Sequence, residues 1–116
     1  MSLPPNIKQR ISSQFEELLS TANGIMPKMQ QSEREQRARD HAANIWNGMA
    51  YHHCTVEFFS LKTRILTLIE HLTFRNANLQ HTAKEISSLT NTISGLKALI
   101  GYLDGLKRDF DSGMFE

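Results

Sequence analysis

The sequence has a single cysteine, Cys54, among its 116 residues. One cysteine excludes an intramolecular disulfide, so the fold cannot depend on the cross-links that stabilise many small secreted domains. No apolar run approaches the roughly 18 residues that a membrane-spanning helix needs, and the first residues lack the apolar segment of a secretory signal. Together these absences predict a cytoplasmic protein without a membrane span.

Charge of one sign is also scarce, since 13 Lys and Arg residues against 12 Asp and Glu residues give a net charge of +1. A balanced chain supplies no field that would hold nucleic acid or an anionic membrane, so neither is an expected partner. The sequence also lacks a glycine-rich phosphate loop, a catalytic pair of carboxylates and a Gly-x-Ser-x-Gly elbow. No cofactor is expected.

What the sequence does contain is a seven-residue repeat of apolar residues through its second half. Spacing of three and four places these side chains on one stripe of a helix, which a partner helix must cover. The repeat weakens near residues 75–82, where we expect a turn, and additional apolar residues flank it: Phe59, Leu66, Ile69, Leu99 and Leu106. The stripe predicts both core and interaction surface, and consists of Phe58, Leu61, Ile65, Leu68, Leu72, Ile86, Leu89, Ile93, Leu96, Ile100 and Leu103.

Helix-ending and helix-starting residues divide the chain into four expected helices. Gly24 and Pro27 predict the end of a short first helix. Ser32 and Thr82 each stand three residues before a glutamate, which matches the capping box at a helix start. The expected helices cover about residues 6–23, 32–47, 50–74 and 82–111, with a flexible N-terminus at 1–5 and a frayed tail at 112–116.

These features predict an all-α protein with one domain over residues 1–116. We expect a three- or four-helix up-down bundle, or an antiparallel coiled-coil hairpin with a short N-terminal helix that packs on the segment around Ile45 and Trp46. The predicted last helix is rich in Ser, Thr, Asn and Gly, which are poor helix formers, so packing must hold it. The mixed charges of residues 33–40 predict a solvated helix face with local ion pairs.

Two histidines stand four residues before a glutamate, which puts each pair on one helix face: His53 with Glu57, and His81 with Glu85. Such pairs are candidate metal ligands between facing helices. The sequence lacks the His-x-x-x-His pair of hemerythrin-like proteins and the two Glu-x-x-His motifs of ferritin-like ones. Two local His–Glu hydrogen bonds at the surface are therefore the preferred interpretation, and Cys54 is expected to be a buried structural thiol.

Residues 75–81 contain Arg-Asn-x4-His, a string that resembles the motif of HEPN-type ribonucleases, which are small all-helical bundles. In that family the Arg and His of two subunits line a cleft and cleave RNA without a metal. The resemblance implies that Arg75 would contact the phosphate and that His81 would act as acid or base. The sequence departs from the family at Gln80 and Thr82, where apolar residues usually flank the histidine.

Trp46, Asn47 and Gly48 form a second resemblance, to the Trp-x-Gly turn of the WXG family of small secreted helical hairpins. The sequence departs from that family in two respects. Pro27 interrupts what should be a single first helix, and the half of the chain after the turn is too long. A core position for Trp46 beside a kink is the alternative interpretation.

The apolar stripe is the strongest signal, and no catalytic arrangement matches it. We therefore predict a non-enzymatic helical-bundle interaction protein, a coiled-coil subunit or adaptor of a larger assembly. It would bind protein partners through its apolar helix stripes and form a homo-oligomer. Two alternatives stay open: a HEPN-like ribonuclease or toxin using Arg75 and His81, and a WXG-like secreted protein.

Overall fold

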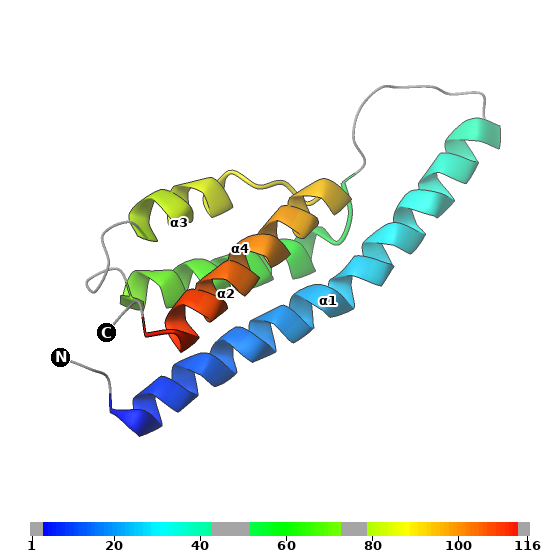
Figure 1. Cartoon of the computed structure of the whole chain (residues 1–116). Helices are drawn as coiled ribbons and strands as arrows, with labels where there is room; N and C mark the ends of the chain where they lie inside the picture. Colours follow the sequence, from blue (N-terminus) through cyan, green and yellow to red (C-terminus); the bar gives the residue numbers. More distant parts are fainter. Residues whose placement is uncertain (1–3, 43–51, 73–78, 114–116) are drawn as a thin grey trace.

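The longest element of the computed structural model is one helix, α1, which spans Pro5–Ala42. The structure describes residues 4–42, 52–72 and 79–113, and the described residues after α1 form α2 (Thr55–Leu72), α3 (Leu79–Ser87) and α4 (Ile93–Asp111). The molecule measures 61 × 23 × 20 Å. At 1.5 Å per residue α1 is about 57 Å long, so it runs the length of the molecule (Figure 1).

The four helices form an up-down bundle, as Figure 1 shows. The start of α1 lies beside the end of α4, where the Ser12 hydroxyl donates a 3.0 Å hydrogen bond to Asp111. Farther along α1, the Ser32 hydroxyl lies 2.8 Å from a ring nitrogen of His53, just before α2. α1 packs mainly against α4, and α2 packs mainly against α3. The prediction of an all-α bundle is confirmed.

The core runs between these helices as one apolar cluster. On α1 the buried side chains follow heptad spacing, and on α2 they follow the predicted stripe together with Ile69. The ring centroids of Phe15 and Phe110 lie 5.8 Å apart, which joins α1 to the last turn of α4. Fully burying an apolar side chain stabilises a fold by about 1.5–3 kcal/mol, so this cluster dominates the stability of the bundle.

The expected break in the first helix was wrong, because α1 continues through Gly24 and Pro27. A proline inside a helix removes one backbone hydrogen bond and costs about 3 kcal/mol in helix propensity. Burial of Ile25 and Met29, which are 4% and 0% exposed, offsets that cost on both sides of the proline. Ser32 consequently lies inside α1, so it does not begin a second helix. The first helix is the longest of the four.

The expected continuous helix over 82–111 was also wrong, since it is divided into α3 and α4. The Lys62 ammonium donates to the carbonyl oxygens of Ser87 (2.8 Å) and Leu89 (2.9 Å), which ends α3. The Thr92 side chain accepts a 3.0 Å hydrogen bond from the Gly95 amide and caps α4. A Cβ at position 95 would clash with the Thr90 carbonyl, so this connection requires glycine.

The remaining boundaries differ by a few residues. α2 begins at Thr55, because residues 52–54 are not helical and Cys54 has a φ of 50°. α3 begins at Leu79, so the expected start at Thr82 was wrong. The segment around Trp46 lies outside the described residues, and so does most of the turn expected near residues 75–81. The ends that were expected to be flexible or frayed lie partly outside them as well, at residues 1–3 and 114–116.

Candidate functional site

Most of the predicted interaction stripe lies inside the chain's own core. Eight of its residues are buried, namely Phe58, Leu61, Ile65, Leu68, Leu72, Ile86, Leu96 and Leu103. The other three, Leu89, Ile93 and Ile100, are half-buried and pack against the same cluster. Their role in binding a partner stays a prediction. A surface that is open to a partner has to be sought on the exposed faces of the helices.

On α4 the buried stripe differs from the predicted one. Leu99 and Leu106, expected as flanks, are 0% and 6% exposed, whereas Ile100 is half-buried. The buried spacing therefore runs through Leu96, Leu99, Leu103, Leu106 and Phe110. The set of buried positions shifts because α4 is a separate helix, which is capped by Thr92 and begins at Ile93. The heptad register of the preceding segment therefore does not continue into α4.

The two candidate metal pairs lie in different surroundings. His53 is 6% exposed and its Nδ1 faces the Ser32 hydroxyl, whereas Glu57 is exposed on α2. The Nε2 atom of His81 lies 2.9 Å from a carboxylate oxygen of Glu85, which is the local surface contact that the spacing predicted. Among the described residues, no group of three or more His, Cys, Asp or Glu side chains could hold a metal ion.

Glu85 also connects α3 to α4. Its other carboxylate oxygen accepts a 2.6 Å hydrogen bond from the Tyr102 hydroxyl, and this bond raises the pKa of Tyr102 above its usual value. His81 is largely exposed and is held by Glu85. Arg75, the other residue of the ribonuclease resemblance, lies outside the described residues. The pairing of Arg75 with His81 therefore stays a hypothesis.

A polar junction of His52, His53, Thr55 and Asn91 joins the start of α2 to the start of α4. The Asn91 amide group donates to the His53 carbonyl (3.2 Å) and to the Thr55 hydroxyl (3.0 Å), and its oxygen lies 2.9 Å from His52 Nδ1. The backbone amide of His53 donates to the Asn91 carbonyl at 2.8 Å. Asn91 is 6% exposed, so this junction fixes the bundle at that end. Sequence reasoning missed it, because its partners are far apart in the chain.

Cys54 follows the polar junction and is half-buried. Burial, helped by the nearby Glu57 carboxylate and opposed by Lys28, raises the pKa of the Cys54 thiol. Nucleophilic cysteines need the opposite shift, since the thiolate is the reactive form. The surroundings of Cys54 therefore favour an inert thiol over a catalytic one.

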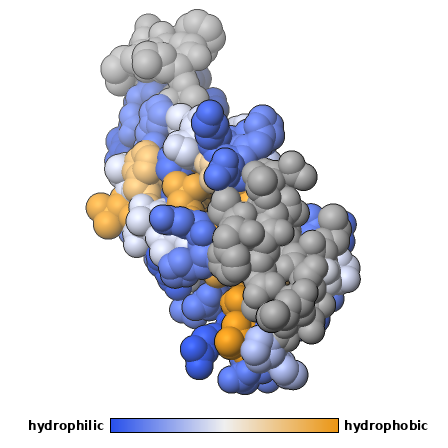
Figure 2. Space-filling view, turned by 90° about the vertical axis from the view of Figure 1, so that its left-hand side faces the viewer, coloured by the Kyte–Doolittle hydropathy of each residue, from blue (hydrophilic) through white to orange (hydrophobic). Residues whose placement is uncertain are grey.

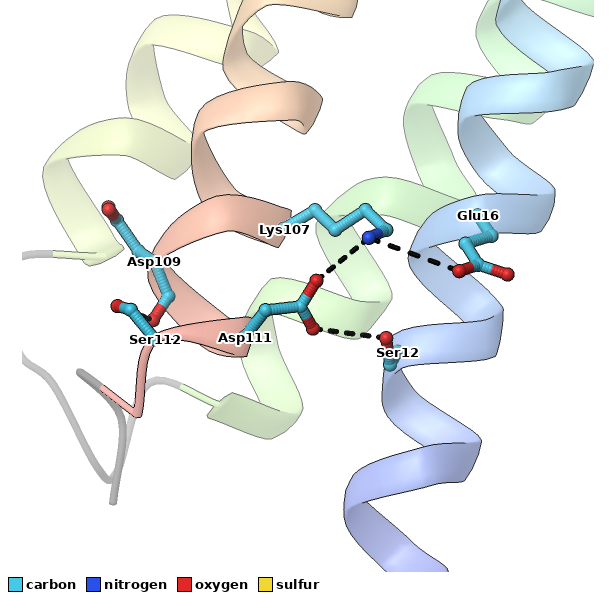
Figure 3. Close-up of polar contacts among 6 residues, drawn as sticks. All are labelled: Ser12, Glu16, Lys107, Asp109, Asp111 and Ser112. Carbon is cyan, nitrogen blue, oxygen red and sulfur yellow. Dashed lines mark hydrogen bonds and ion pairs between the residues drawn. The ribbon is translucent and has the colours of Figure 1, made fainter.

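At the other end of the bundle a polar clamp joins α1 to α4 (Figure 3). Lys107 lies between Asp111 (2.8 Å) and Glu16 of α1 (3.9 Å), while Ser12 of α1 donates to the same aspartate. The hydrogen bond from Lys107 holds the pKa of Asp111 below its usual value. The same bond raises the pKa of Lys107. The clamp therefore holds the start of α1 against the end of α4 through one ammonium shared by two carboxylates and through one hydroxyl.

Residues 30–42 of α1, here called the arm, contain no buried side chain. The arm contains the mixed charges expected to form a solvated face. Its side chains pair locally: Arg37 with Glu33 (3.7 Å), Gln31 with Glu35 (3.2 Å) and Gln36 with Asp40 (3.1 Å). Such pairs stabilise a helix by only about 0.2–0.5 kcal/mol each. The arm projects past the start of α2 in Figure 1.

Two hollows lie in the groove between α1 and α2. One measures about 300 Å³ and lies against Gln14 and Glu17, and the other measures about 480 Å³ and lies against Thr21, Gly24 and Lys28. Arg64 of α2 borders both hollows and forms a 3.1 Å ion pair with Glu17. The α1–α2 groove is therefore open to solvent along much of the bundle.

Exposed apolar side chains are few among the described residues. The large ones are Val56, at 79% exposed, Phe59, at 41%, and Ile7, at 39%. The Lys62 ammonium lies 4.8 Å from the centre of the Phe59 ring and partly covers it. Figure 2 shows hydrophobic residues only as small separate groups between hydrophilic ones on the face that it displays. A surface that binds a partner would therefore have to include polar residues as well as apolar ones.

No helix within the described segments is long and apolar enough to cross a membrane. Comparison of the chain with family models, curated proteins and solved structures gave no match. One argument against the WXG resemblance fails, because Pro27 does not interrupt α1. Its Trp-x-Gly motif lies outside the described residues, and the described chain has four helices where that family has a two-helix hairpin.

Proposed function

We propose that this protein is a non-enzymatic helical-bundle interaction protein, a subunit or adaptor that assembles with protein partners. The observation that carries the proposal is the arm, which continues α1 over residues 30–42 without burying a side chain. Isolated helices shorter than about 12–15 residues are marginal in water. A helical arm whose side chains all stay exposed or half-buried is therefore best explained as a surface that another protein covers.

Two further features support the proposal. The groove between α1 and α2 is open, so the bundle offers a second face beside the arm. The thiol of Cys54 has a raised pKa, and no described group of acidic and histidine side chains could hold a metal ion, so neither suggests chemistry. The proposal includes a cytoplasmic location, which the free Cys54 supports.

The test compares the protein in its native extract with the purified chain of 13.3 kDa. We expect the native protein to migrate in a larger complex. Amide hydrogens of residues 30–42 should exchange slowly in that complex and quickly in the dilute purified chain. A native species at the monomer mass, with an arm that exchanges equally fast in both samples, would exclude the proposal.

The enzymatic alternative is tested with the same purified protein. If it cleaves RNA, and if His81→Ala abolishes cleavage while helix content stays unchanged, the ribonuclease interpretation replaces the proposed one. Gln80→Ala is the matched control, because Gln80 is also exposed and stands beside His81 on α3. Under the proposed function neither variant affects assembly beyond the loss of the His81–Glu85 contact.

A further inference from the structure

One lateral face of α1 carries a polar stripe that repeats at heptad spacing, adjacent to the buried stripe. All of its members are exposed except Thr21, which is half-buried. The stripe includes the α1 residues that line the two hollows of the α1–α2 groove. It extends from the first turns of α1 into the arm and consists of Arg10, Gln14, Glu17, Thr21, Gly24, Lys28, Gln31 and Glu35.

This stripe is complementary to itself when reversed. If a second copy of α1 runs antiparallel about the midpoint between Ala22 and Asn23, each stripe residue meets a suitable counterpart. Arg10 then faces Glu35 of the second copy, Gln14 faces Gln31, Glu17 faces Lys28 and Thr21 faces Gly24. Every charged residue of the stripe meets the opposite charge, and the small residues meet where the helices approach most closely.

We propose that a second copy of this chain binds along this face, forming an antiparallel pair of α1 helices with a two-fold axis near residues 22 and 23. The inference rests on the proposed function and names the partner for that surface. An interface of this type is isologous, so each ion pair occurs twice. Complementary charges of this kind set the partner and the register of paired helices.

The centre of the stripe permits a close approach. Nothing lies within 4 Å of the position that a Cβ would take at Gly24, so the bundle itself does not require glycine there. The Thr21 hydroxyl donates to the Glu17 carbonyl in its own helix (2.9 Å). On the opposite wall, Thr63 and Thr67 make the same type of bond within α2. These hydroxyls are therefore already bonded, and the two stripe residues nearest the proposed axis, Thr21 and Gly24, are small.

The charged residues of the stripe are placed where they could form ion pairs with a second copy of α1. Glu17 is held by Arg64 at 3.1 Å, which positions its carboxylate at the groove. Lys28 forms no ion pair with any residue that the structure describes. A second copy would provide Glu17 as the partner of Lys28. The polar arm would then lie against the first turns of the second α1, with Glu35 beside Arg10.

The test measures self-association by light scattering and sedimentation across a dilution series at low salt. We expect the wild-type chain to dimerise. Lys28→Glu places two like-charged contacts in each dimer and should weaken it by about tenfold or more. Lys97→Glu is the matched control, because it makes the same change on an exposed residue of α4, outside the stripe. It should leave dimerisation unchanged.

Charge exchange identifies the pairing itself. The double variant Glu17→Lys/Lys28→Glu restores opposite charges and should dimerise again. The single variants Glu17→Lys and Lys28→Glu should each dimerise weakly alone but form a tighter heterodimer when mixed. Gly24→Leu should prevent dimerisation through bulk, whereas Gly101→Leu, at another open helix glycine, should not. Helix content by circular dichroism verifies that each variant folds.

A wild-type chain that stays monomeric throughout the series would overturn the inference. A dimer that is insensitive to Lys28→Glu, or two single variants that do not pair when mixed, would overturn it as well. These failures are distinct from failure of the proposed function. A monomeric purified chain that enters a larger native complex with a different protein leaves the proposed function standing and removes only the second copy as partner.

Discussion

The two halves of α1 share one continuous backbone but are held by different forces. In residues 5–29 a buried stripe packs against the bundle: Phe15, Leu18, Ala22, Ile25 and Met29. In the arm, residues 30–42, no side chain is buried and the side chains pair locally. Burial supplies kilocalories per residue, whereas local pairs supply tenths. Helical conformation alone therefore does not show which part of a helix is stabilised by the fold.

The largest expected effect comes from breaking the packed half. Phe15→Ala should lower the free energy of unfolding by about 3–5 kcal/mol, because it removes a fully buried ring that packs on Phe110. Gln30→Ala in the arm should change it by no more than about 0.5 kcal/mol, because Gln30 is exposed. Urea unfolding followed by circular dichroism measures both. Similar losses for the two variants would refute the contrast between the halves.

Replacing the proline should stabilise the protein. Pro27 is exposed, so Pro27→Ala loses little packing and restores a backbone donor toward the Asn23 carbonyl. The expected gain is about 1–3 kcal/mol, reduced by the greater freedom of the unfolded chain. Thermal unfolding would show a higher midpoint, with Gln30→Ala as the control at an exposed position in the arm. A lower midpoint would show that the proline contributes to the packed half.

Ser32 marks the boundary between the two halves, because it is the first arm residue with a contact to the bundle. Ser32→Ala removes the contact with His53 and should reduce stability by about 1 kcal/mol. Amides of residues 33–42 should exchange faster, while those of residues 10–29 should not change. Ser13→Ala is the control, as Ser13 is an exposed serine in the packed half. Uniform acceleration along α1 would contradict the expected boundary.

The smallest expected effect concerns the polar clamp and depends on pH. The Lys107 contact holds the pKa of Asp111 below its usual value of 3.8. Its stabilisation is therefore present above pH 3.8 and is lost as the pH falls through the lower folded value. The side chain is 42% exposed, so the effect should stay below about 1 kcal/mol. Asp111→Asn should remove this part of the acid dependence, and Asp109→Asn, its control, should retain it.

The sequence predicted the elements that depend on near neighbours. The stripe of α2 is as expected, because three- and four-residue spacing describes one helix face wherever that helix packs. The continuity of α1 was missed, because the sequence shows the helix-breaking cost of Pro27 directly. It does not show that Ile25 and Met29 are buried against other helices, which offsets that cost. The phase of α4 was missed for a similar reason. It depends on a cap at Thr92 and on contacts with α1.

The surface was harder to predict than the core. Apolar periodicity identified residues that the chain buries in its own bundle, so it could not separate core from interface. The polar junction depends on Asn91 reaching His52, 39 residues away in the chain. No local pattern indicates such a bond. The polar stripe of α1 can be recognised in the sequence once α1 is known to be one helix. Only an unbroken helix keeps the residues of the stripe on one face.

The close approach of Gly95 to the Thr90 carbonyl has an evolutionary consequence. Any other amino acid at this position would force the α3–α4 connection to move, since its Cβ would meet backbone rather than a flexible side chain. Relatives that diverge beyond recognition elsewhere should therefore retain a glycine three residues after the threonine that begins α4. The proposed pairing of two α1 helices would add a second expectation, namely that positions 17 and 28 keep opposite charges and change together. A search for distant members of this lineage can use the glycine, and the two charges then provide a further test of the proposed pairing.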